Sequence, residues 1–275
     1  MTAAALTEAG KVGAFVRRDL LIAWSYRLGF VTDVVSMAAQ AFVFSIVGQL
    51  VDPARMPSYD GSPTTYMEFV AIGLVLNLVI TLLLDRVAGA IRHEQVIGTL
   101  ESLLTTPTRT ATIQVGSAAF EFLWVPVRAT LFLLAIALGF GLNLHASGIL
   151  PAAAVLLAFI PFVWGLGLVS AATMLTFRRG GGGAAAVAAL LGLASGAFFP
   201  VELLPGWLSW TTAVNPIAIA LEGIRESLLG GAGWGQTWPA MLTLAPLSAT
   251  ALAAGVLAFR LALKRERRLG TLGLY

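Results

Sequence analysis

The sequence predicts an all-α integral membrane protein with six transmembrane helices in a single transmembrane domain, residues 1–275. Of these residues 58% are hydrophobic and only 11% are charged, whereas a soluble domain carries about 25% charged residues. The apolar residues are gathered in long stretches. A helix needs roughly 20 apolar residues to cross a bilayer, because each residue rises about 1.5 Å through about 30 Å of hydrocarbon. The basic residues lie mostly between these stretches, where they do not interrupt a span.

Six apolar stretches are long enough to be spans, and polar segments separate most of them. A loop with three prolines ends the first, and the charged segment after the second ends with a Thr-Pro pair. Proline disrupts a continuing helix, so these positions are natural span boundaries. The expected spans are residues 28–51, 66–84, a stretch within 110–142, and residues 149–177, 182–199 and 241–263.

Three segments outside the spans are expected to be helical without crossing the membrane. Residues 1–27 alternate apolar and charged positions, which is typical of an interfacial helix. Residues 85–109 have a helical pattern but too many charges for lipid, so they are expected at the cytoplasmic surface. Residues 200–239 contain four tryptophans, which favour the headgroup level. We expect short interfacial or re-entrant helices there, on the outer side.

The basic residues predict the orientation. With six spans, fourteen Lys and Arg residues fall on one side of the membrane, and only Arg55 and Arg225 fall on the other. Cytoplasmic segments carry the excess of Lys and Arg. Both termini are therefore expected in the cytoplasm, in a multi-pass protein of the cell membrane. The richness in Ala, Gly and Arg suggests a bacterium, and hence a bacterial inner membrane.

Several kinds of chemistry are missing from the sequence. There is no cysteine, and the glycines at 180–183 lack the Lys of a phosphate-binding loop. His93 and Glu94 begin like a zinc-protease helix, but Ile97 stands where the second histidine is needed. The scattered basic residues do not form a nucleic-acid surface. We therefore expect no enzyme activity, no cofactor or metal on this chain, and no nucleic-acid partner.

The alternative function is a stand-alone secondary transporter or channel. Ionisable residues within the spans would favour it, because a charge in the membrane is costly and is retained only for function. The candidates are Asp33, Glu121 and Arg128. Glu121 and Arg128 are seven residues apart and so share a helix face. The interpretation we favour puts Glu121 at the interface with Arg128 snorkelling toward it. The alternative, in which Glu121 and Arg128 form a functional pair, stays open.

The cytoplasmic segment between the second and third spans carries the strongest functional signal. Its residues 93–110 read HEQVIGTLESLLTTPTRT and resemble the coupling helix of the type 2 ATP-binding-cassette (ABC-2) transporter permeases. That family has a leading acidic residue, a Gly-Thr-Leu-Glu run and a Leu-Leu-x-Thr-Pro ending. The matching positions are Glu94, Gly98, Thr99, Leu100, Glu101, Leu103, Leu104, Thr106 and Pro107.

A second resemblance lies at residues 198–216, where FFPVELLPGWLSWTTAVNP is similar to the outer segment of the same permeases. The resemblance implies the membrane subunit of an exporter. Its expected partners are a nucleotide-binding ATPase subunit, which holds ATP and Mg, a second permease subunit of the same or a related kind, and the lipid bilayer. Relatives handle drugs, lipids and glycans. The apolar spans favour an amphipathic or lipid-like cargo.

Two further groups of residues are candidates for the substrate pathway or the dimer interface. Asp33, Gln40 and Gln49 form part of a polar stripe on the first span, and such a stripe faces protein or water. Helix-to-helix hydrogen bonding explains the stripe equally well. Gly192 and Gly196 have the spacing that lets two helices approach closely. In the ABC-2 permeases the first and fifth spans border the pathway and the subunit interface.

Overall fold

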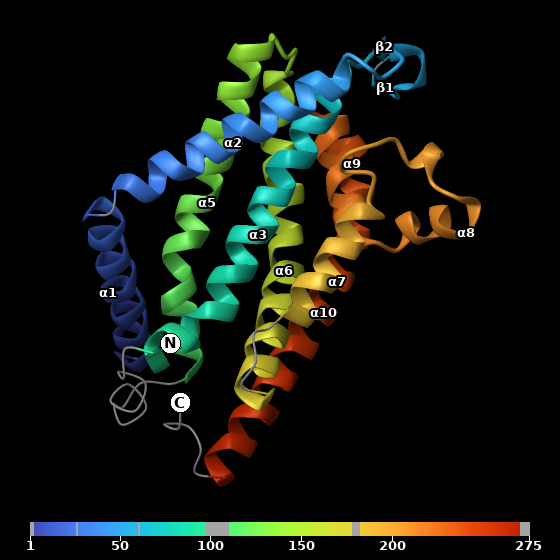
Figure 1. Ribbon diagram of the computed structural model, residues 1–275. Coiled ribbons are helices and arrows are strands. Elements are labelled where there is room, and N and C mark those ends of the chain that lie inside the picture. The colour runs from blue at the N-terminus through green and yellow to red at the C-terminus, as the bar shows by residue number, and fades with distance from the viewer. Residues whose placement is uncertain (1–2, 26, 60, 97–109, 178–181, 270–275) are drawn as a thin grey trace.

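The computed structural model describes residues 3–25, 27–59, 61–96, 110–177 and 182–269, and these residues are mostly helical (Figure 1). The α-helices are α1 (Ala3–Ser25), α2 (Arg27–Gly48), α3 (Tyr66–Val96), α5 (Thr110–Phe140), α6 (Ile149–Phe177), α7 (Gly182–Leu193), α8 (Gly206–Ser209), α9 (Pro216–Leu228) and α10 (Trp234–Leu269). Short 3-10 helices are η1 (Pro53–Arg55), η2 (Ala146–Gly148), η3 (Val201–Leu203) and η4 (Trp210–Ala213).

An antiparallel β-hairpin with two residues in each strand lies between α2 and α3. Its strands are β1 (Ser58–Tyr59) and β2 (Ser62–Pro63), and Ser58 pairs with Pro63 while Tyr59 pairs with Ser62. Gly61 in the turn has a φ of 72°, a conformation that costs glycine little because it has no Cβ. The hairpin brings the Tyr59 side chain over the bundle.

Four helical stretches of the described chain are long and apolar enough to cross a membrane. They are Tyr66–Val87, Leu123–Phe140, Ala146–Phe177 and Trp234–Glu266. Two shorter apolar stretches are Val34–Gly48 in α2 and Gly183–Leu193 in α7. The prediction of an all-α membrane protein is therefore confirmed. The count of six spans needs both shorter stretches to cross as well, and it stays a prediction.

Some predicted boundaries need correction. The expected surface segment 85–109 does not begin at a break, because α3 runs without interruption from Tyr66 to Val96. The expected span at 182–199 is helical only as far as Leu193. A helix of twelve residues rises about 18 Å, which is shorter than the hydrocarbon of a bilayer. The last helix begins at Trp234, so two of the four tryptophans of the outer segment belong to α10.

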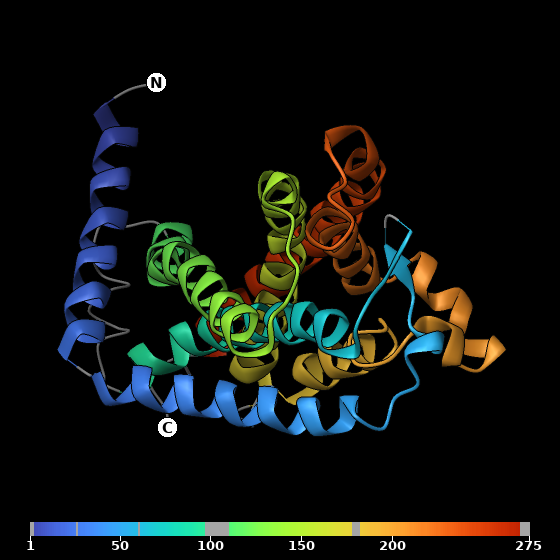
Figure 2. The ribbon, with the colours of Figure 1, turned by 90° about the horizontal axis from the view of Figure 1, so that it is seen from above.

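The helices α3, α5, α6 and α10 run side by side, and α9 joins them at one end (Figure 1). The core between these helices includes Val155 and Phe159 of α6 and Leu221 of α9, whose side chains are fully buried. Figure 2 shows that α1 lies along one side of the bundle and α2 along the adjacent side, and Figure 1 shows that α2 crosses the long helices at a large angle. Val35, Phe42 and Val43 of α2 are exposed, so an apolar surface faces outward there.

The two ends of the bundle differ. The Val96 end of α3, the Phe177 end of α6 and the Leu269 end of α10 lie at the lower end in Figure 1, while β1, β2 and α8 lie toward the other end. Basic residues are gathered in the lower parts of α3 and α10, within or just after the last turns of their apolar stretches: Arg86, Arg260, Lys264, Arg265 and Arg268. The two ends of the bundle are thus chemically different: one is basic, and the other is covered by short helices.

The helices α6 and α10 approach each other closely. A Cβ on Gly165 would lie 2.4 Å from the carbonyl carbon and oxygen of Ala251, and a Cβ on Gly255 would lie 2.4 Å from the carbonyl oxygen of Gly165. Real Cβ atoms do not approach backbone this closely, so both positions require glycine. Small residues allow such an approach between membrane helices, where dispersion contacts drive association.

Candidate functional site

Of the nine predicted coupling residues, Glu94 is the one that falls within the described part of the chain. Glu94 belongs to the last turn of α3. The other eight, Gly98, Thr99, Leu100, Glu101, Leu103, Leu104, Thr106 and Pro107, lie outside the described residues. Along the chain, α3 precedes this segment and α5 follows it.

An ion-pair cluster connects α1 to α3 near this segment. The Asp19 carboxylate of α1 is buried and accepts hydrogen bonds from Arg18, at 2.9 Å, and from Arg86 of α3. Charge-assisted bonds of this kind are stronger than neutral ones. The N-terminal helix is therefore tied to the helix that leads into the predicted coupling segment. Asp19 could not be recognised from the sequence, because its partner Arg86 lies 67 residues further along the chain.

A mostly apolar cavity of about 450 Å³ lies between α2 and α5. Its lining includes Met37 and Phe42 of α2 and Phe132 of α5, and Arg128 is the one charged residue among the described side chains that line it. Arg128 lies within the apolar stretch Leu123–Phe140, and Glu121 precedes that stretch. Arg128 thus borders a cavity next to the first predicted span.

The polar stripe predicted on the first span is only partly visible. Gln40 of α2 is exposed and does not line this cavity, and Gln49 is exposed in the turn after α2. Asp33 lies in α2, and its side chain is outside the described part of the structure. The grouping of these three residues at a pathway or dimer interface stays a prediction.

Gly192 and Gly196 do not share a helix. Gly192 lies in the last turn of α7, whereas Gly196 follows the helix in a turn with a φ of 76°. A Cβ on Gly196 would meet the Val201 side chain at 2.6 Å, whereas a Cβ on Gly192 would meet no atom of the described residues outside its own helix within 4 Å. The prediction that Gly192 and Gly196 form a small-residue seam on one helix face is therefore wrong. Gly196 lies in a turn with positive φ, a conformation that favours glycine.

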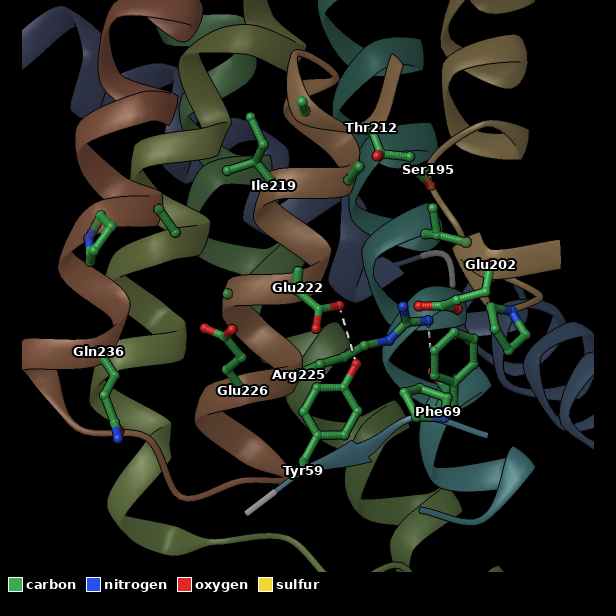
Figure 3. Close-up of a pocket in the computed structure, with 18 residues that line it drawn as sticks. Tyr59, Phe69, Ser195, Glu202, Thr212, Ile219, Glu222, Arg225, Glu226 and Gln236 are labelled. Atoms are coloured by element: carbon green, nitrogen blue, oxygen red, sulfur yellow. Dashed lines mark hydrogen bonds between the residues drawn. The ribbon is translucent and has the colours of Figure 1, made fainter. Parts of the chain in front are cut away.

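The turn after α7 forms part of a second cavity (Figure 3). We call it the outer cavity, after the side of the membrane on which the sequence predicts it, and its volume is about 620 Å³. Residues from the hairpin, α3, the α7–η3 turn, η4, α9 and α10 line it. Segments distant in the sequence meet here, which explains why no local motif revealed it.

Arg225 of α9 holds one wall of the outer cavity. Its side chain is 1% exposed, and Nη2 donates to the carbonyl oxygens of Phe69 at 3.0 Å, Gly196 at 3.1 Å and Ala197 at 3.3 Å. The guanidinium also lies 3.4 Å from the centre of the Phe69 ring (Figure 3), within the range of a cation–π contact. Arg225 therefore joins α9 to α3 and to the turn after α7. Burial lowers the pKa of Arg225 to about 10, which leaves it charged at neutral pH.

Acidic groups line the same cavity. Tyr59 donates a hydrogen bond of 3.1 Å from its hydroxyl to the Glu222 carboxylate, and burial together with this carboxylate raises the pKa of Tyr59. Glu222 keeps contact with solvent, yet the surrounding protein raises its carboxyl pKa. Partial burial and the neighbouring Glu222 also raise the pKa of Glu226. These two carboxylates are one helical turn apart on α9 and repel each other.

Hydrogen bonds also fix the ends of the surrounding helices. Asn215 caps α9 by accepting from the Ile217 amide at 3.0 Å, and its Nδ2 donates to the Leu191 carbonyl of α7 at 2.8 Å. Pro216 is the first residue of α9, a position at which a backbone N–H has no partner within the helix, so proline costs no hydrogen bond there. The Asn-Pro pair in the resemblance at residues 198–216 thus has a structural role: it starts α9 and joins that helix to α7.

Glu68 plays the corresponding role at the start of α3. Its carboxylate accepts from the Thr65 amide at 2.8 Å and from the Asn143 amide at 3.0 Å, and the Thr65 hydroxyl accepts from the Glu68 amide at 3.2 Å. This is a capping box, and its signature Thr-x-x-Glu was available in the sequence. Glu68 also joins α3 to the connection between α5 and α6.

The fold and these sites define a class of protein. Long apolar helices, a basic end and an opposite end covered by short helices and a polar cavity are typical of the membrane domain of a transporter. Within the described residues, no group of three or more His, Asp or Glu side chains could hold a metal ion.

The chain belongs to the ABC-2 type transporter family, whose sequence model matches residues 11–229. It is 27% identical over 207 residues to the inner membrane transport permease YadH of Escherichia coli K12, covering 74% of this chain and 78% of YadH. It is also 25% identical over 192 residues to ABC transporter G family member 20 of Dictyostelium discoideum, covering 68% of this chain and 26% of that protein. The resemblance noted in the sequence is thereby confirmed, and the chain is a membrane permease of this family.

Proposed function

We propose that the chain is the membrane-spanning subunit of an ATP-driven exporter, whose motor is a separate ATPase subunit. The observation that carries the proposal is the family match over residues 11–229, which includes the whole predicted coupling segment. The 275 residues contain no phosphate-binding loop with its Lys and Ser or Thr, so ATP and Mg would be held by the partner.

The proposed assembly contains two permease subunits, identical or related, and their ATPases. The exposed apolar surfaces of α2 and α7, which include Val35, Phe42 and Leu190, support this arrangement. In a membrane such surfaces face lipid or another subunit. With α2 and α7 as spans the chain crosses the bilayer six times, and the basic end with both termini lies in the cytoplasm, as the excess of Lys and Arg indicates. The printed name of YadH supports an inner membrane location.

Cargo would move from the cytoplasmic to the outer side. The apolar cavity between α2 and α5, with Arg128 in its wall, supports an amphipathic cargo. Lipid-like, drug-like and glycan substrates all belong to this proposal. Charge-driven transport without an ATPase would instead need an ionisable relay across the spans.

Charge reversal in the coupling segment tests the proposal. Glu94 and Glu101 are seven residues apart, so on a continuous helix they project from one face and could pair with basic residues of the motor. We expect Glu94→Lys with Glu101→Lys to lose most of the ATPase that co-purifies with the chain, and to lose the ATP hydrolysis that depends on it.

The matched control is Asp52→Lys, the same reversal in the exposed loop before α3. It should keep the partner and the hydrolysis. Thermal unfolding in detergent should be the same for both variants, so that loss of the partner reflects the charge reversal and not loss of the fold. Full retention of the ATPase by the Glu94 and Glu101 double variant would remove these residues from the proposed site.

A further inference from the structure

We propose that the outer cavity beside α9 binds a protonated amine that also carries a hydrogen-bond acceptor. Its role as a site on the export route rests on the proposed function, but the binding itself follows from the cavity. The ligand class is an organic cation, such as the amino group of a cargo molecule or of a lipid headgroup.

The size of the cavity fits a small organic molecule. Its volume of about 620 Å³ lies within the roughly 300–1,000 Å³ of typical ligand pockets. The cavity is bounded on one side by α9 and on the others by the hairpin, the turn after α7 and the start of α10. Most of these walls are fixed by the hydrogen bonds of Arg225 and Asn215 described above.

The charge of the cavity selects a cation. Glu202, Glu222 and Glu226 all line it, and Arg225 is its one basic lining residue. No described side chain forms an ion pair with any of the three carboxylates. Arg225 attracts the nearby Glu222 carboxylate, but its Nη2 donates to backbone carbonyls and its guanidinium lies over the Phe69 ring, so it forms no ion pair with the three carboxylates. The carboxylates repel one another, and a bound cation would relieve this repulsion.

An unsatisfied hydrogen-bond donor in the cavity wall indicates that the ligand also carries a hydrogen-bond acceptor. Nε of Arg225 has no hydrogen-bond partner, although the side chain is 1% exposed and lines the cavity (Figure 3). A buried donor left without an acceptor costs free energy. A ligand with a hydroxyl, carbonyl or phosphate oxygen near its ammonium group would supply the missing acceptor while the carboxylates bind the cation.

An amine fits the cavity better than a metal ion does. Within the described chain, no three acidic or histidine side chains are close enough together to hold a metal. Glu222 and Glu226 lie on one helix, Glu202 belongs to η3, and Gln236 and Thr212 supply uncharged polar atoms. Dispersed carboxylates and neutral polar groups suit an ammonium group on an organic body.

The test is direct binding to the purified full chain in phosphatidylcholine nanodiscs, without any ATPase. The probe is the fluorescent primary amine dansylcadaverine, and its N-acetyl derivative serves as the uncharged analogue. We expect the amine to bind at least about fivefold more tightly than the acetyl derivative, which is the factor that one modest ion pair supplies. Glu222→Gln with Glu226→Gln should remove this preference.

The matched control is Asp52→Asn, which removes one negative charge outside the cavity and keeps the cap on Ala54. It should bind like the unmodified chain, and unchanged thermal unfolding should show that all variants are folded. Equal binding of the two probes, or a preference that survives the double variant, would overturn the proposal.

Competition identifies the source of the amine. If phosphatidylethanolamine added to the nanodiscs displaces the probe, a lipid headgroup occupies the cavity; if it does not, the cavity serves a cargo amine. Both results keep the amine site. Because the assay contains no ATPase, its failure would leave the proposed exporter function unaffected, and failure of ATPase co-purification would leave the binding result unaffected.

Discussion

Arg225→Met should destabilise the protein by about 3 kcal/mol, because it leaves buried carbonyl oxygens without their donor. Nη2 of Arg225 is the donor to Gly196 and Ala197 in the turn after α7, and neither residue belongs to a helix that would satisfy its carbonyl. The contact between the guanidinium and the Phe69 ring is lost as well. The measurement is the thermal unfolding midpoint of the purified chain in detergent.

Two further variants make this result specific. Arg225→Lys keeps the charge but lacks the planar geometry of the guanidinium, so it should be intermediate. Arg55→Met removes an exposed arginine from η1 and should leave the midpoint unchanged. If Arg225→Met unfolds at the same temperature as Arg55→Met, Arg225 does not hold α9 to α3 and to the turn after α7.

Gly165→Ala should separate α6 from α10 and destabilise the protein by about 2 kcal/mol, the usual cost of overpacking. The added Cβ would meet the Ala251 backbone at 2.4 Å. Backbone atoms within a long helix cannot move individually, so the two helices must shift as units. The effect should appear as a lower unfolding midpoint and as earlier aggregation on heating.

Gly139→Ala is the matched control for this change. Gly139 lies in α5, and nothing within the chain is near the position of its Cβ. Alanine is a better helix former than glycine, so this variant should be as stable as the unmodified chain or slightly more stable. Equal midpoints for Gly165→Ala and Gly139→Ala would contradict the close packing of α6 on α10.

The long helices could be predicted from the sequence because each is a run of apolar residues bounded by polar ones. Residues 149–177 were expected as a span and form α6 with the same bounds. The expected stretch within 110–142 is α5. In these cases length and composition alone decide the structure, since a helix is the simplest way to satisfy the backbone in lipid.

The end of α7 could not be predicted in this way. Residues 194–199 are as apolar as the helix before them, but the chain turns at Gly196, whose carbonyl is held by Arg225. The partner lies 29 residues further along. A tertiary hydrogen bond therefore overrides local helix propensity at this point.

The outer cavity was missed for the same reason. Tyr59 and Glu222 are 163 residues apart, and Arg225 and Phe69 are 156 apart. In the sequence Arg225 was counted only as one of two basic residues on the outer side. Glu68 was the exception, because the Thr-x-x-Glu pattern of its capping box is local and could have been found.

The central claim is that this permease works with a separate ATPase, and co-purification tests it most directly. The tagged chain should be isolated from its native membranes in mild detergent, its stoichiometric partners identified, and ATP hydrolysis measured. The account predicts a partner with a phosphate-binding loop, and loss of both the partner and the hydrolysis when residues 94–107 are removed. A folded chain that is isolated without an ATP-binding partner, and that transports without ATP, would contradict it.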